Sequence, residues 1–412
     1  MTGWSGEAGL DALKTRRATA TRRYVVHEGR LAAVPTKLGA LLATPLWSRR
    51  GKLRLLAEPF IGKGGHERET VSEFVTRRLG REMLEKAMEP FVAGTLASDP
   101  ARANAYAVLP QLTGLERRYG GIARGVLLHR LLRKRAQCAA EAFSFDGGMA
   151  TLVEALAATP GIRLRTGLAA TEIRPARGGW RVTGRSAKFE PVLRVRRVVL
   201  STPADAAAAL VRPLDGELAA LLAGIDYAPL SVVHLGFARQ AIAHPLDGTG
   251  FLLPRTERLA PTGCLWMSAM FPDRAPAGRT LLSCYLGGAR LPEAAAWDDS
   301  RSVSEVLAGL APLLGIRGTP EMARVDRHQR ALPLYHGAYY ERMHALARRL
   351  EALPGLHLEA NYREGVSVRN RLARAREVAA AIAAQCASKS AAPQRGQRVS
   401  RSPGQAASEL AG

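Results

Sequence analysis

One stretch near the C-terminus constrains the fold more than any other part of this sequence. Leu353 to Val368 has the sequence LPGLHLEANYREGVSV, and an Ala- and Arg-rich run follows it to Ala384. The pattern predicts a short strand over Leu356 to Leu358, a turn over Asn361 to Gly365 and a helix from Ser367. The N–H groups of the turn and the positive end of the helix dipole suit an anion or an electron-rich ring edge. An ordinary strand-to-helix connection has the same pattern, so this stretch alone indicates no function.

Size and charge limit the classes of protein that fit. The 412 residues are 47% hydrophobic and 23% charged, which is typical of a globular protein with two or three domains. The 59 Lys and Arg against 36 Asp and Glu give a net charge of +23, which favours a nucleic acid, an acidic membrane surface or an anionic small molecule as partner. Aromatic residues are only 6%, too few for a stacking platform, so we expect no nucleic-acid partner.

Other signals concern localisation and chemistry. The cysteines at positions 138, 264, 284 and 386 form no C-x-x-C pair, so we expect reduced, buried thiols in a cytoplasmic protein and no metal site. No run of eighteen apolar residues predicts a transmembrane helix, and residues 1 to 14 lack the apolar core of a signal peptide. No Ser-His-Asp set and no pair of catalytic carboxylates stands out.

The N-terminal part predicts a hairpin and then helices. Arg22 to Pro35 contains two β-prone runs on either side of a Glu-Gly turn. Helical periodicity begins near Glu69, with Ser72 as the expected N-cap. The apolar face of this helix is formed by Val71, Phe74, Val75 and Leu79. A later basic run, His129 to Arg135, suits either anionic lipid or a solvated helix face.

The remaining chain is richer in strand patterns. Phe143 to Leu156 predicts a strand, a Gly turn and a helix, and Gly161 to Ile173 predicts an alternating strand. Arg194 to Pro203 predicts an apolar strand before an Ala-rich helix. From Tyr227 to Gly288, short strands separated by Gly and Pro predict an antiparallel sheet and therefore a second domain.

Several motifs together resemble one family, in the family's order. They are an Arg-Tyr hairpin from Arg22, Glu89-Pro-Phe-x-x-Gly-x-x-x-x-Asp-Pro, Phe271-Pro-Asp-Arg-Ala-Pro-x-Gly-Arg with a following Tyr-x-Gly-Gly, and Asn361-Tyr-x-x-Gly-Val-x-Val. The chain resembles the protoporphyrinogen oxidases, a family within the amine-oxidase-like flavoproteins, over most of Arg22 to Ala384. The hairpin that begins at Phe271 looks like that of the plant-type enzymes and is the most specific of these motifs.

The resemblance implies an α/β fold with three parts: a Rossmann-like FAD-binding domain, an antiparallel-sheet substrate domain and a helical, membrane-contacting block. The expected boundaries are a poorly ordered segment 1–20, substrate-domain segments 21–65 and 211–335, the helical block 66–142, FAD-domain segments 143–210 and 336–386, and a disordered tail 387–412.

The resemblance also assigns substrate contacts. Arg23 is implied to pair with a propionate of the porphyrinogen, which suits guanidinium geometry. Gly94 is implied to lie beside the macrocycle, where a missing side chain gives a flat ring room. The residues implied to clamp the ring are Leu252, Leu265 and Tyr285. Each of these residues, considered by itself, is also consistent with a purely structural role. Arg23 fits a solvated surface side chain, Gly94 fits a turn glycine, and the other three fit residues of a core strand.

The implied cofactor is FAD. The residues implied to contact it are Ala170, Tyr340, Asn361, Gly365, Val366, Ser367 and Val368. The implied reaction is oxidation of protoporphyrinogen IX to protoporphyrin IX with dioxygen as acceptor. Three alternatives stay open: coproporphyrinogen as substrate, an amine or carotenoid-type oxidoreductase, and a non-catalytic remnant that binds porphyrin or membrane. We further expect a homodimer and peripheral contact with the cytoplasmic face of a membrane.

One family element is missing from the sequence. FAD-binding chains of this type open on G-x-G-x-x-G, with an acidic residue about 20 positions later. The nearest candidates fail, because Gly62 and Gly64 are followed by Glu67, and Gly248 and Gly250 by Leu253. We expect that the start of the chain is misplaced, and a truncated copy is the alternative.

Overall fold

The computed structural model describes residues 15–17, 20–35, 38–132 and 143–390. It divides into two compact units, Met1–Val366 and Ser367–Gly412, and the helix α15 (Val368–Ser390) lies in the second. Disorder was expected for residues 1–20 and 387–412. Within these segments, residues 1–14, 18–19 and 391–412 lie outside the described residues, whereas Thr15–Arg17 form the strand β1 and residues 387–390 belong to α15. Everything that follows, unless stated otherwise, concerns the first unit.

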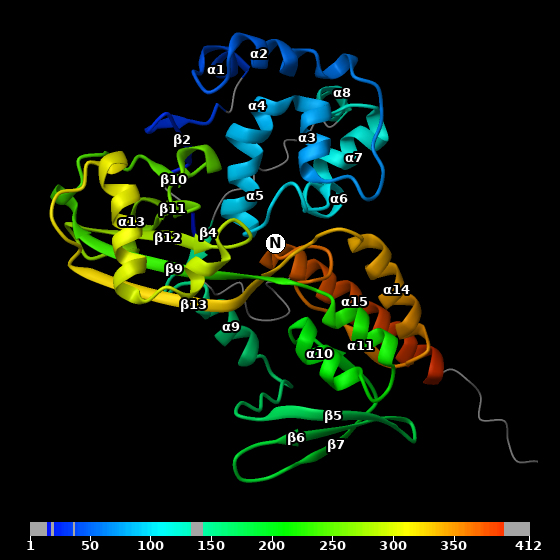
Figure 1. Ribbon diagram of the computed structural model, residues 1–412. Coiled ribbons are helices and arrows are strands. Elements are labelled where there is room, and N and C mark those ends of the chain that lie inside the picture. The colour runs from blue at the N-terminus through cyan, green and yellow to red at the C-terminus, as the bar shows by residue number, and fades with distance from the viewer. Residues whose placement is uncertain (1–14, 18–19, 36–37, 133–142, 391–412) are drawn as a thin grey trace, which may run out of the picture. The chain divides into compact units, whose positions relative to one another are not determined.

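The largest described sheet has seven strands in the order β13-β9-β12-β11-β10-β2-β3 (Figure 1). Their bounds are Met322–Pro333, Tyr227–Ala238, Arg279–Gly287, Gly263–Trp266, Gly248–Leu252, Arg22–His27 and Arg30–Ala33. The predicted N-terminal hairpin is confirmed as β2 and β3. It joins the sheet through a parallel pairing of β2 with β10, whereas the other neighbours are antiparallel. The sheet is therefore mixed rather than purely antiparallel.

One face of this sheet is the core of its domain. Alternate residues along each strand point to it, as the period of two requires. Helix α13 (Asp299–Leu314) covers this face and contributes Val306, Leu310 and Leu314. The buried strand residues include Val233, Leu235, Phe251, Cys264, Trp266, Leu282, Cys284 and Leu286. The opposite face is only partly buried, and it is the face that matters for the site.

A helical block follows the hairpin. Its helices are α1 (Leu38–Ala43), α2 (Arg49–Leu56), α3 (Val71–Leu79), α4 (Arg81–Met83), a π-helical turn (Leu84–Met88), α5 (Glu89–Leu96), α6 (Ala105–Val108), α7 (Pro110–Tyr119) and α8 (Ile122–Leu132). The predicted apolar face of α3 is confirmed for Val71, Phe74 and Val75, which are fully buried. Residues 133–135 of the basic run lie outside the described residues.

The predicted N-cap of α3 was wrong. Thr70, not Ser72, caps the helix, because its hydroxyl accepts from the N–H of Glu73 and the Glu73 carboxylate accepts from the N–H of Thr70. This reciprocal capping box satisfies two N–H groups at once. The T-x-x-E spacing was present in the sequence and identifies the cap better than Ser72 does.

Two fully buried charges hold the helical block together. Arg78 on α3 pairs with Glu58, and both side chains are almost completely buried. The Arg78 guanidinium also donates to the carbonyls of Ile61 and Gly120, and Glu58 accepts from the N–H of Ile122 at 2.8 Å, at the start of α8. A buried ion pair is tolerated when most of its remaining hydrogen bonds are made. Here Arg78 Nε is the guanidinium nitrogen without a partner among the described residues.

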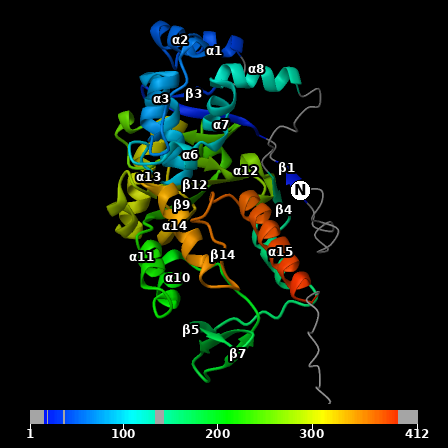
Figure 2. The ribbon, with the colours of Figure 1, turned by 90° about the vertical axis from the view of Figure 1, so that its right-hand side faces the viewer.

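A second core surrounds a short parallel pair of strands, β8 (Val198–Leu200) and β14 (Leu356–Leu358). The helices α10 (Ala204–Val211), α11 (Gly216–Ala223) and α14 (Tyr339–Glu351) contribute buried residues to it. The predicted strand over Leu356 to Leu358 is confirmed. Figure 2 shows α10, α11 and α14 grouped on one side of β14.

The other small sheets flank these cores. One has the order β5-β6-β7 (Ala169–Ala176, Gly179–Arg185, Val192–Val195), and another pairs β1 (Thr15–Arg17) with β4 (Phe143–Phe145), which precedes α9 (Ala150–Ala157). The strand predicted from Gly161 to Ile173 was wrong in its first half. Ile162 and Leu164 are exposed, and Gly167 has a φ of +67°, which interrupts an extended strand before β5.

Two further expectations have outcomes here. Cys264 and Cys284 are free and buried as predicted, whereas Cys386 is exposed because it lies on an open face of α15; Cys138 lies outside the described residues. Among the described residues, no helix is both long and apolar enough to span a membrane.

Candidate functional site

The three predicted ring-clamping residues lie on one face of the large sheet. Leu252 on β10 is paired with Gly263 on β11, which is paired in turn with Tyr285 on β12. Leu265 follows Gly263 by two positions and so points to the same side. All three side chains are partly buried, while the alternating residues Phe251 and Cys264 point into the core. The sheet therefore presents these apolar side chains together on its open face.

Glycines separate the apolar side chains on this face. Gly263 lies between Leu252 and Tyr285, and Gly250 is paired with Leu265. Neither position has room for a side chain, because a Cβ on Gly263 would lie 2.9 Å from the carbonyl oxygen of Phe251 and one on Gly250 would lie 2.0 Å from that of Cys264. The result is a low, flat apolar surface between raised side chains, which suits a planar ligand.

Gly94 meets this surface from the helical block. A Cβ on Gly94 would lie 2.5 Å from Cδ2 of Leu252 and 3.3 Å from the carbonyl oxygen of Thr262. Helix α5 therefore approaches β10 and β11 closely at this point. The structure brings Gly94 together with the predicted clamp, and the space left by the missing side chain is filled by Leu252.

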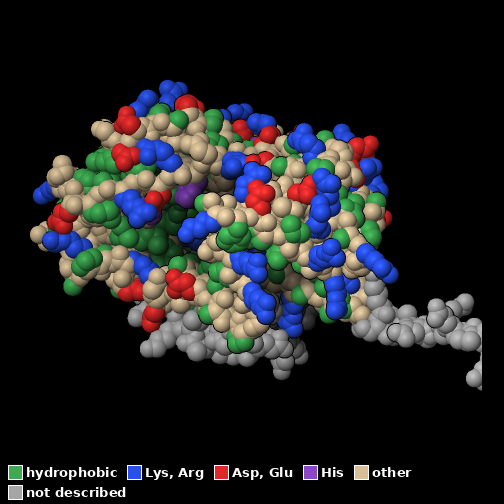
Figure 3. Space-filling model, turned by 90° about the horizontal axis from the view of Figure 1, so that it is seen from below, with side chains coloured by type: hydrophobic (Ala, Val, Ile, Leu, Met, Phe, Trp, Pro, Cys, Tyr) green, Lys and Arg blue, Asp and Glu red, His purple; other side chains and the backbone are tan. Residues whose placement is uncertain are grey.

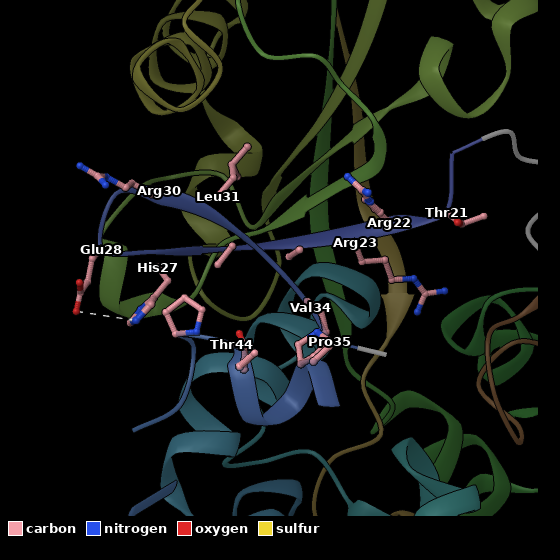
Figure 4. A pocket seen from close by; sticks show the side chains of 15 residues that line it. Thr21, Arg22, Arg23, His27, Glu28, Arg30, Leu31, Val34, Pro35 and Thr44 are labelled. Atoms are coloured by element: carbon pink, nitrogen blue, oxygen red, sulfur yellow. Dashed lines mark ion pairs between the residues drawn. The ribbon is translucent and has the colours of Figure 1, made fainter. Parts of the chain in front are cut away.

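Arg23 lies on the same face, at the β2 edge. Val25 is paired with Leu252, and Arg23 precedes Val25 by two positions. The adjacent Arg22 is held by Asp247 at 2.5 Å, and Asp247 also accepts from the hydroxyl of Tyr24 at 2.6 Å. Figure 4 shows the Arg22 and Arg23 side chains leaving β2 on different sides.

The two arginines therefore differ in what they can bind. The Tyr24 hydroxyl, together with Arg22, holds the pKa of Asp247 below its usual range, so Arg22 keeps a charged partner. No carboxylate among the described residues is paired with the exposed Arg23 guanidinium. Arg23 also lines a hollow of about 910 Å³ beside the β2–β3 hairpin, with His27 and Arg30 on its wall (Figure 4). Its guanidinium is therefore available to an external carboxylate.

The open face also carries a polar cluster that sequence reasoning missed. The hydroxyl Oγ of Ser283 on β12 lies 2.8 Å from Nδ1 of His234 on β9, and Nε2 of His234 lies 3.5 Å from Oδ2 of Asp326 on β13. No Ser-His-Asp set stands out in the sequence, but the structure brings these three side chains together. These residues are far apart in the sequence, and only the strand register brings them together.

The turn over Asn361 to Gly365, where the flavin is predicted to bind, is called the flavin turn below. It is held by two tyrosines that the sequence did not single out. The Tyr335 hydroxyl donates to the carbonyl of Asn361 at 2.6 Å, and the N–H of Glu364 donates to the Tyr339 hydroxyl at 2.9 Å. Burial raises the pKa of Tyr339 to about 12, so this hydroxyl stays protonated. Gly365 has a φ of +105°, which L-residues rarely adopt.

The other predicted cofactor residues are distributed more widely. Tyr340 is partly buried on α14, and its ring lies 5.3 Å from that of Tyr339, so it is close to the turn. Ala170 is exposed on β5, in a different sheet, opposite Gly184. Val366 ends the first unit. Ser367 and Val368 belong to the second, where the Ser367 hydroxyl accepts from the N–H of Asn370 at 3.2 Å and caps α15.

The residues beyond the carboxyl ends of β8 and β14 fit part of a dinucleotide cofactor. The strands β8 and β14 run parallel and end at Leu200 and Leu358, and ligands of α/β domains bind beyond the carboxyl ends of such strands. Just beyond β8, the buried hydroxyl of Thr202 has no hydrogen-bond partner among the described residues, and the same holds for the hydroxyl of Tyr362 after β14. These groups fit a ligand with hydrogen-bonding edges. The sequence shows no glycine-rich loop for a pyrophosphate.

Comparison with known proteins identifies the family. The family model of flavin-containing amine oxidoreductases matches residues 5–383. The chain belongs to this family. FAD, the cofactor expected from the sequence, is thereby confirmed, as is the expectation of an oxidoreductase with a mixed α/β fold.

Relatives within this family sharpen the assignment. The chloroplastic protoporphyrinogen oxidase of Nicotiana tabacum is 30% identical over 392 residues, covering 87% of this chain and 70% of the tobacco protein. The mitochondrial tobacco enzyme is 29% identical over 380 residues, covering 84% of this chain and 75% of that protein. The coproporphyrinogen III oxidase of Bacillus subtilis (strain 168) is 27% identical over 378 residues, covering 88% and 79%.

Solved structures agree on the fold of this flavin-containing amine oxidoreductase. A candidate protoporphyrinogen oxidase from Exiguobacterium sp. 255-15 superimposes with a TM-score of 0.75 at 20% identity, covering 92% of this chain and 84% of that one. A putrescine oxidase superimposes with a TM-score of 0.59 at 13% identity, with the same coverage. The predicted resemblance to the protoporphyrinogen oxidases is confirmed.

Proposed function

We propose that this protein oxidises protoporphyrinogen IX to protoporphyrin IX with FAD as the hydride acceptor. The observation that carries the proposal is the open face of the large sheet. It presents Leu252, Leu265 and Tyr285 as a flat apolar surface, with Arg23 on the same face at the sheet edge. The names of the relatives, protoporphyrinogen oxidase and coproporphyrinogen III oxidase, support the same substrate class.

The residues of the chain bind and orient the ring in this proposal. The macrocycle lies flat on the sheet against the Leu252, Leu265 and Tyr285 side chains, where burial of apolar area contributes about 25 cal/mol per Å². Arg23 pairs with a propionate at the ring's edge. Because Leu252 fills the space at Gly94 in this structure, ring binding involves a rotation of the Leu252 side chain.

The flavin turn is the proposed cofactor contact. Asn361, Gly365 and Val366 provide its backbone edge, and Tyr340 packs beside it; Ser367 and Val368 continue the same chain segment into α15, and Ala170 contributes from β5. When bound, FAD takes up hydride from the porphyrinogen, and we propose dioxygen as the acceptor that reoxidises it.

Coproporphyrinogen is the second candidate substrate. It carries more propionates than protoporphyrinogen, so it needs more cationic anchors. Arg30 and His27 line the hollow beside the hairpin with Arg23, and Figure 4 shows the Arg30 side chain leaving the hairpin on the side opposite to Arg23. This observation favours coproporphyrinogen as a substrate. The turnover experiment described below distinguishes the two substrates.

We propose that the helical block contacts a membrane peripherally, on its cytoplasmic face. The apolar side chains Leu53, Leu56 and Phe60 are exposed next to basic residues of α2, and Phe60 is 85% exposed. Leu127 on α8 is exposed as well, and α8 contacts the turn that contains Phe60 (Figure 2). Apolar side chains with adjacent Lys and Arg suit an anionic lipid surface.

On the face shown in Figure 3, Lys and Arg side chains are interspersed with Asp and Glu. Pelleting with phosphatidylserine vesicles tests the helical block. Phe60→Ser is expected to lower the bound fraction several-fold, whereas the exposed β7 variant Val192→Ser leaves it unchanged. Equal binding of all three proteins contradicts the membrane proposal.

The experiment that tests the function is turnover by the purified, FAD-supplemented protein. Protoporphyrinogen IX and coproporphyrinogen III are offered separately in air, and the fluorescence of the porphyrin product is followed beside the visible flavin spectrum. We expect a bound flavin spectrum and product formation from protoporphyrinogen IX. Exclusive use of coproporphyrinogen III favours the second candidate. Bound flavin without oxidation of either substrate overturns both.

A further inference from the structure

The Ser283–His234–Asp326 cluster lies on the same face of the sheet as the proposed ring surface. Ser283 is paired with Leu265 on one side and with His234 on the other, so all three residues share that face. His234 and Tyr285 are diagonal neighbours on adjacent strands, roughly 7–8 Å apart between Cα atoms. A tetrapyrrole resting on Leu265 and Tyr285 therefore extends over the His234 imidazole.

The imidazole, not the serine, is the group that can meet a ligand. Ser283 is 2% exposed, so its hydroxyl is enclosed by the sheet, whereas the His234 side chain is 30% exposed. The contact of 2.8 Å between Nδ1 and the Ser283 Oγ fixes the ring orientation. Nε2 is only loosely placed against Asp326, at 3.5 Å, and is the nitrogen left for an incoming proton.

The charges that face His234 suit a base that picks up a proton and then releases it. Desolvation lowers the pKa of His234 below 6.5 and Arg324 lowers it further, while Asp326 opposes both. The imidazole is therefore neutral at neutral pH. Arg324 holds Oδ1 of Asp326 at 2.8 Å and keeps that carboxylate ionised, with Oδ2 directed at His234. A proton that arrives on Nε2 faces this carboxylate.

The reaction requires such a base. Each cycle removes a C–H hydrogen with its electron pair from a bridging carbon, as hydride to the flavin. The adjacent pyrrole loses its N–H proton, and the electron pair of that N–H bond enters the new conjugated double bond. After the third cycle, a proton of the fourth bridging carbon moves to a pyrrole nitrogen, which gives the four methine bridges and two N–H groups of the porphyrin. The hydride is taken up by FAD, but the proton needs an acceptor at the ring.

We propose that His234 is the catalytic base that accepts this pyrrole proton at Nε2, with Ser283 and Asp326 as positioning residues. This inference rests on the proposed function. The proton moves from the pyrrole nitrogen to Nε2, and then past the partly exposed Asp326 carboxylate to water. Ser283 accepts from Nδ1–H in this arrangement and keeps Nε2 on the side of the imidazole that faces Asp326.

The test compares wild type, His234→Gln, Asp326→Asn and the exposed control His66→Gln, each with FAD. Two quantities are measured: the Kd of protoporphyrin IX by fluorescence, and kcat for porphyrinogen oxidation between pH 5 and 9. A glutamine can still hydrogen-bond Ser283 but cannot take up a proton. We expect His234→Gln to keep the Kd within about threefold while kcat falls roughly a hundredfold, in the range for general bases.

The pH profile separates a base from a structural role. In the wild type, kcat is expected to fall as pH drops through the pKa of His234, and this acid limb disappears in His234→Gln. Asp326→Asn removes the charge that raises this pKa, so its acid limb moves to lower pH. His66→Gln is expected to match the wild type throughout.

The outcomes distinguish a failure of the proposed function from a failure of the assignment of His234 as the base. If the wild type neither binds the porphyrin nor oxidises a porphyrinogen, the proposed function fails. If it does both and His234→Gln retains the kcat and the acid limb of the wild type, the function stands and the assignment of His234 is overturned. A loss of porphyrin affinity in His234→Gln equal to its loss of kcat also overturns it, because a base acts on the chemical step.

Discussion

Gly94 on α5 and Leu252 on β10 are in direct contact, and a Cβ on Gly94 would lie 2.5 Å from Cδ2 of Leu252. The contact joins the helical block to the apolar surface of the sheet. The position of the Leu252 side chain therefore depends on the absence of a side chain at residue 94.

Gly94→Ala should weaken porphyrin binding without unfolding the protein. Alanine favours the helix by about 1 kcal/mol over glycine, which offsets a cost of about 0.5–1.5 kcal/mol for moving Leu252 off its rotamer. The displaced Leu252 side chain then occupies the ring surface, so we expect the Kd of protoporphyrin IX to rise roughly tenfold, about 1.4 kcal/mol. Fluorescence titration and urea unfolding measure the two effects.

The controls for this prediction use the same helix block and the same contact. Gly114→Ala on α7 has no neighbour within 4 Å and should leave the Kd unchanged. Adding Leu252→Ala to Gly94→Ala removes the clash and should restore part of the affinity. A double variant that binds as weakly as Gly94→Ala argues against Leu252 as the cause.

Arg23 and Arg22 should differ in their effect on binding although they are neighbours. Arg23→Gln removes the guanidinium that has no carboxylate partner among the described residues, so we expect the porphyrin Kd to rise roughly tenfold at low salt and less at high salt. Arg22→Gln removes a cation already held by Asp247 and should change the Kd less than threefold. Isothermal titration at two salt concentrations checks both. Equal effects of the two substitutions would exclude a specific role for Arg23.

The buried Arg78–Glu58 pair should dominate the stability of the helical block. Arg78→Leu leaves the Glu58 carboxylate buried without its cation, so we expect a loss of about 3–5 kcal/mol in the free energy of unfolding. Adding Glu58→Gln should recover part of this loss. Arg81→Leu removes an exposed pair with Glu85 and should cost less than about 1 kcal/mol. Urea unfolding measures all three, and similar losses for Arg78→Leu and Arg81→Leu would refute the prediction.

His336 should make the folded protein sensitive to mild acid. Burial, aided by Arg102, lowers the pKa of His336 from 6.5 to about 4, while Nε2 lies 2.9 Å from the Ser98 hydroxyl. Between these values the unfolded chain binds a proton that the folded chain does not, so stability is full above pH 6.5 and falls as the pH drops toward 4. The melting temperature of His336→Gln should fall less than that of the wild type between pH 7 and 5. Parallel curves would contradict this.

The sequence was sufficient for features that depend on neighbouring residues. The strand at Leu356 to Leu358 and the hairpin from Arg22 follow from local patterns of apolar residues and turn-forming residues, and the structure has both. Leu252, Leu265 and Tyr285, which the resemblance named, lie on one face of β10, β11 and β12. Their contact with a tetrapyrrole stays a prediction.

The features that were missed depend on contacts between distant segments. Ser283, His234 and Asp326 come from three strands, and a shift of the register by one residue would have separated them. The pairing of Glu58 with Arg78 has no local signal either, because it depends on how the 3-10 turn Glu58–Phe60 packs against α3. The cap at Thr70 is different, since its T-x-x-E pattern was visible in the sequence and was overlooked in favour of Ser72.

The most direct test of the central claim is to place a charge on the open face of the sheet. Leu265→Arg puts a guanidinium at the middle of the proposed ring surface, and Val192→Arg puts the same group on an exposed position of β7. The rate of porphyrin formation from protoporphyrinogen IX is measured for both variants with FAD bound. The account predicts that Leu265→Arg keeps its flavin and loses at least tenfold in kcat/KM, while Val192→Arg equals the wild type. Wild-type turnover by Leu265→Arg would show that the ring binds elsewhere.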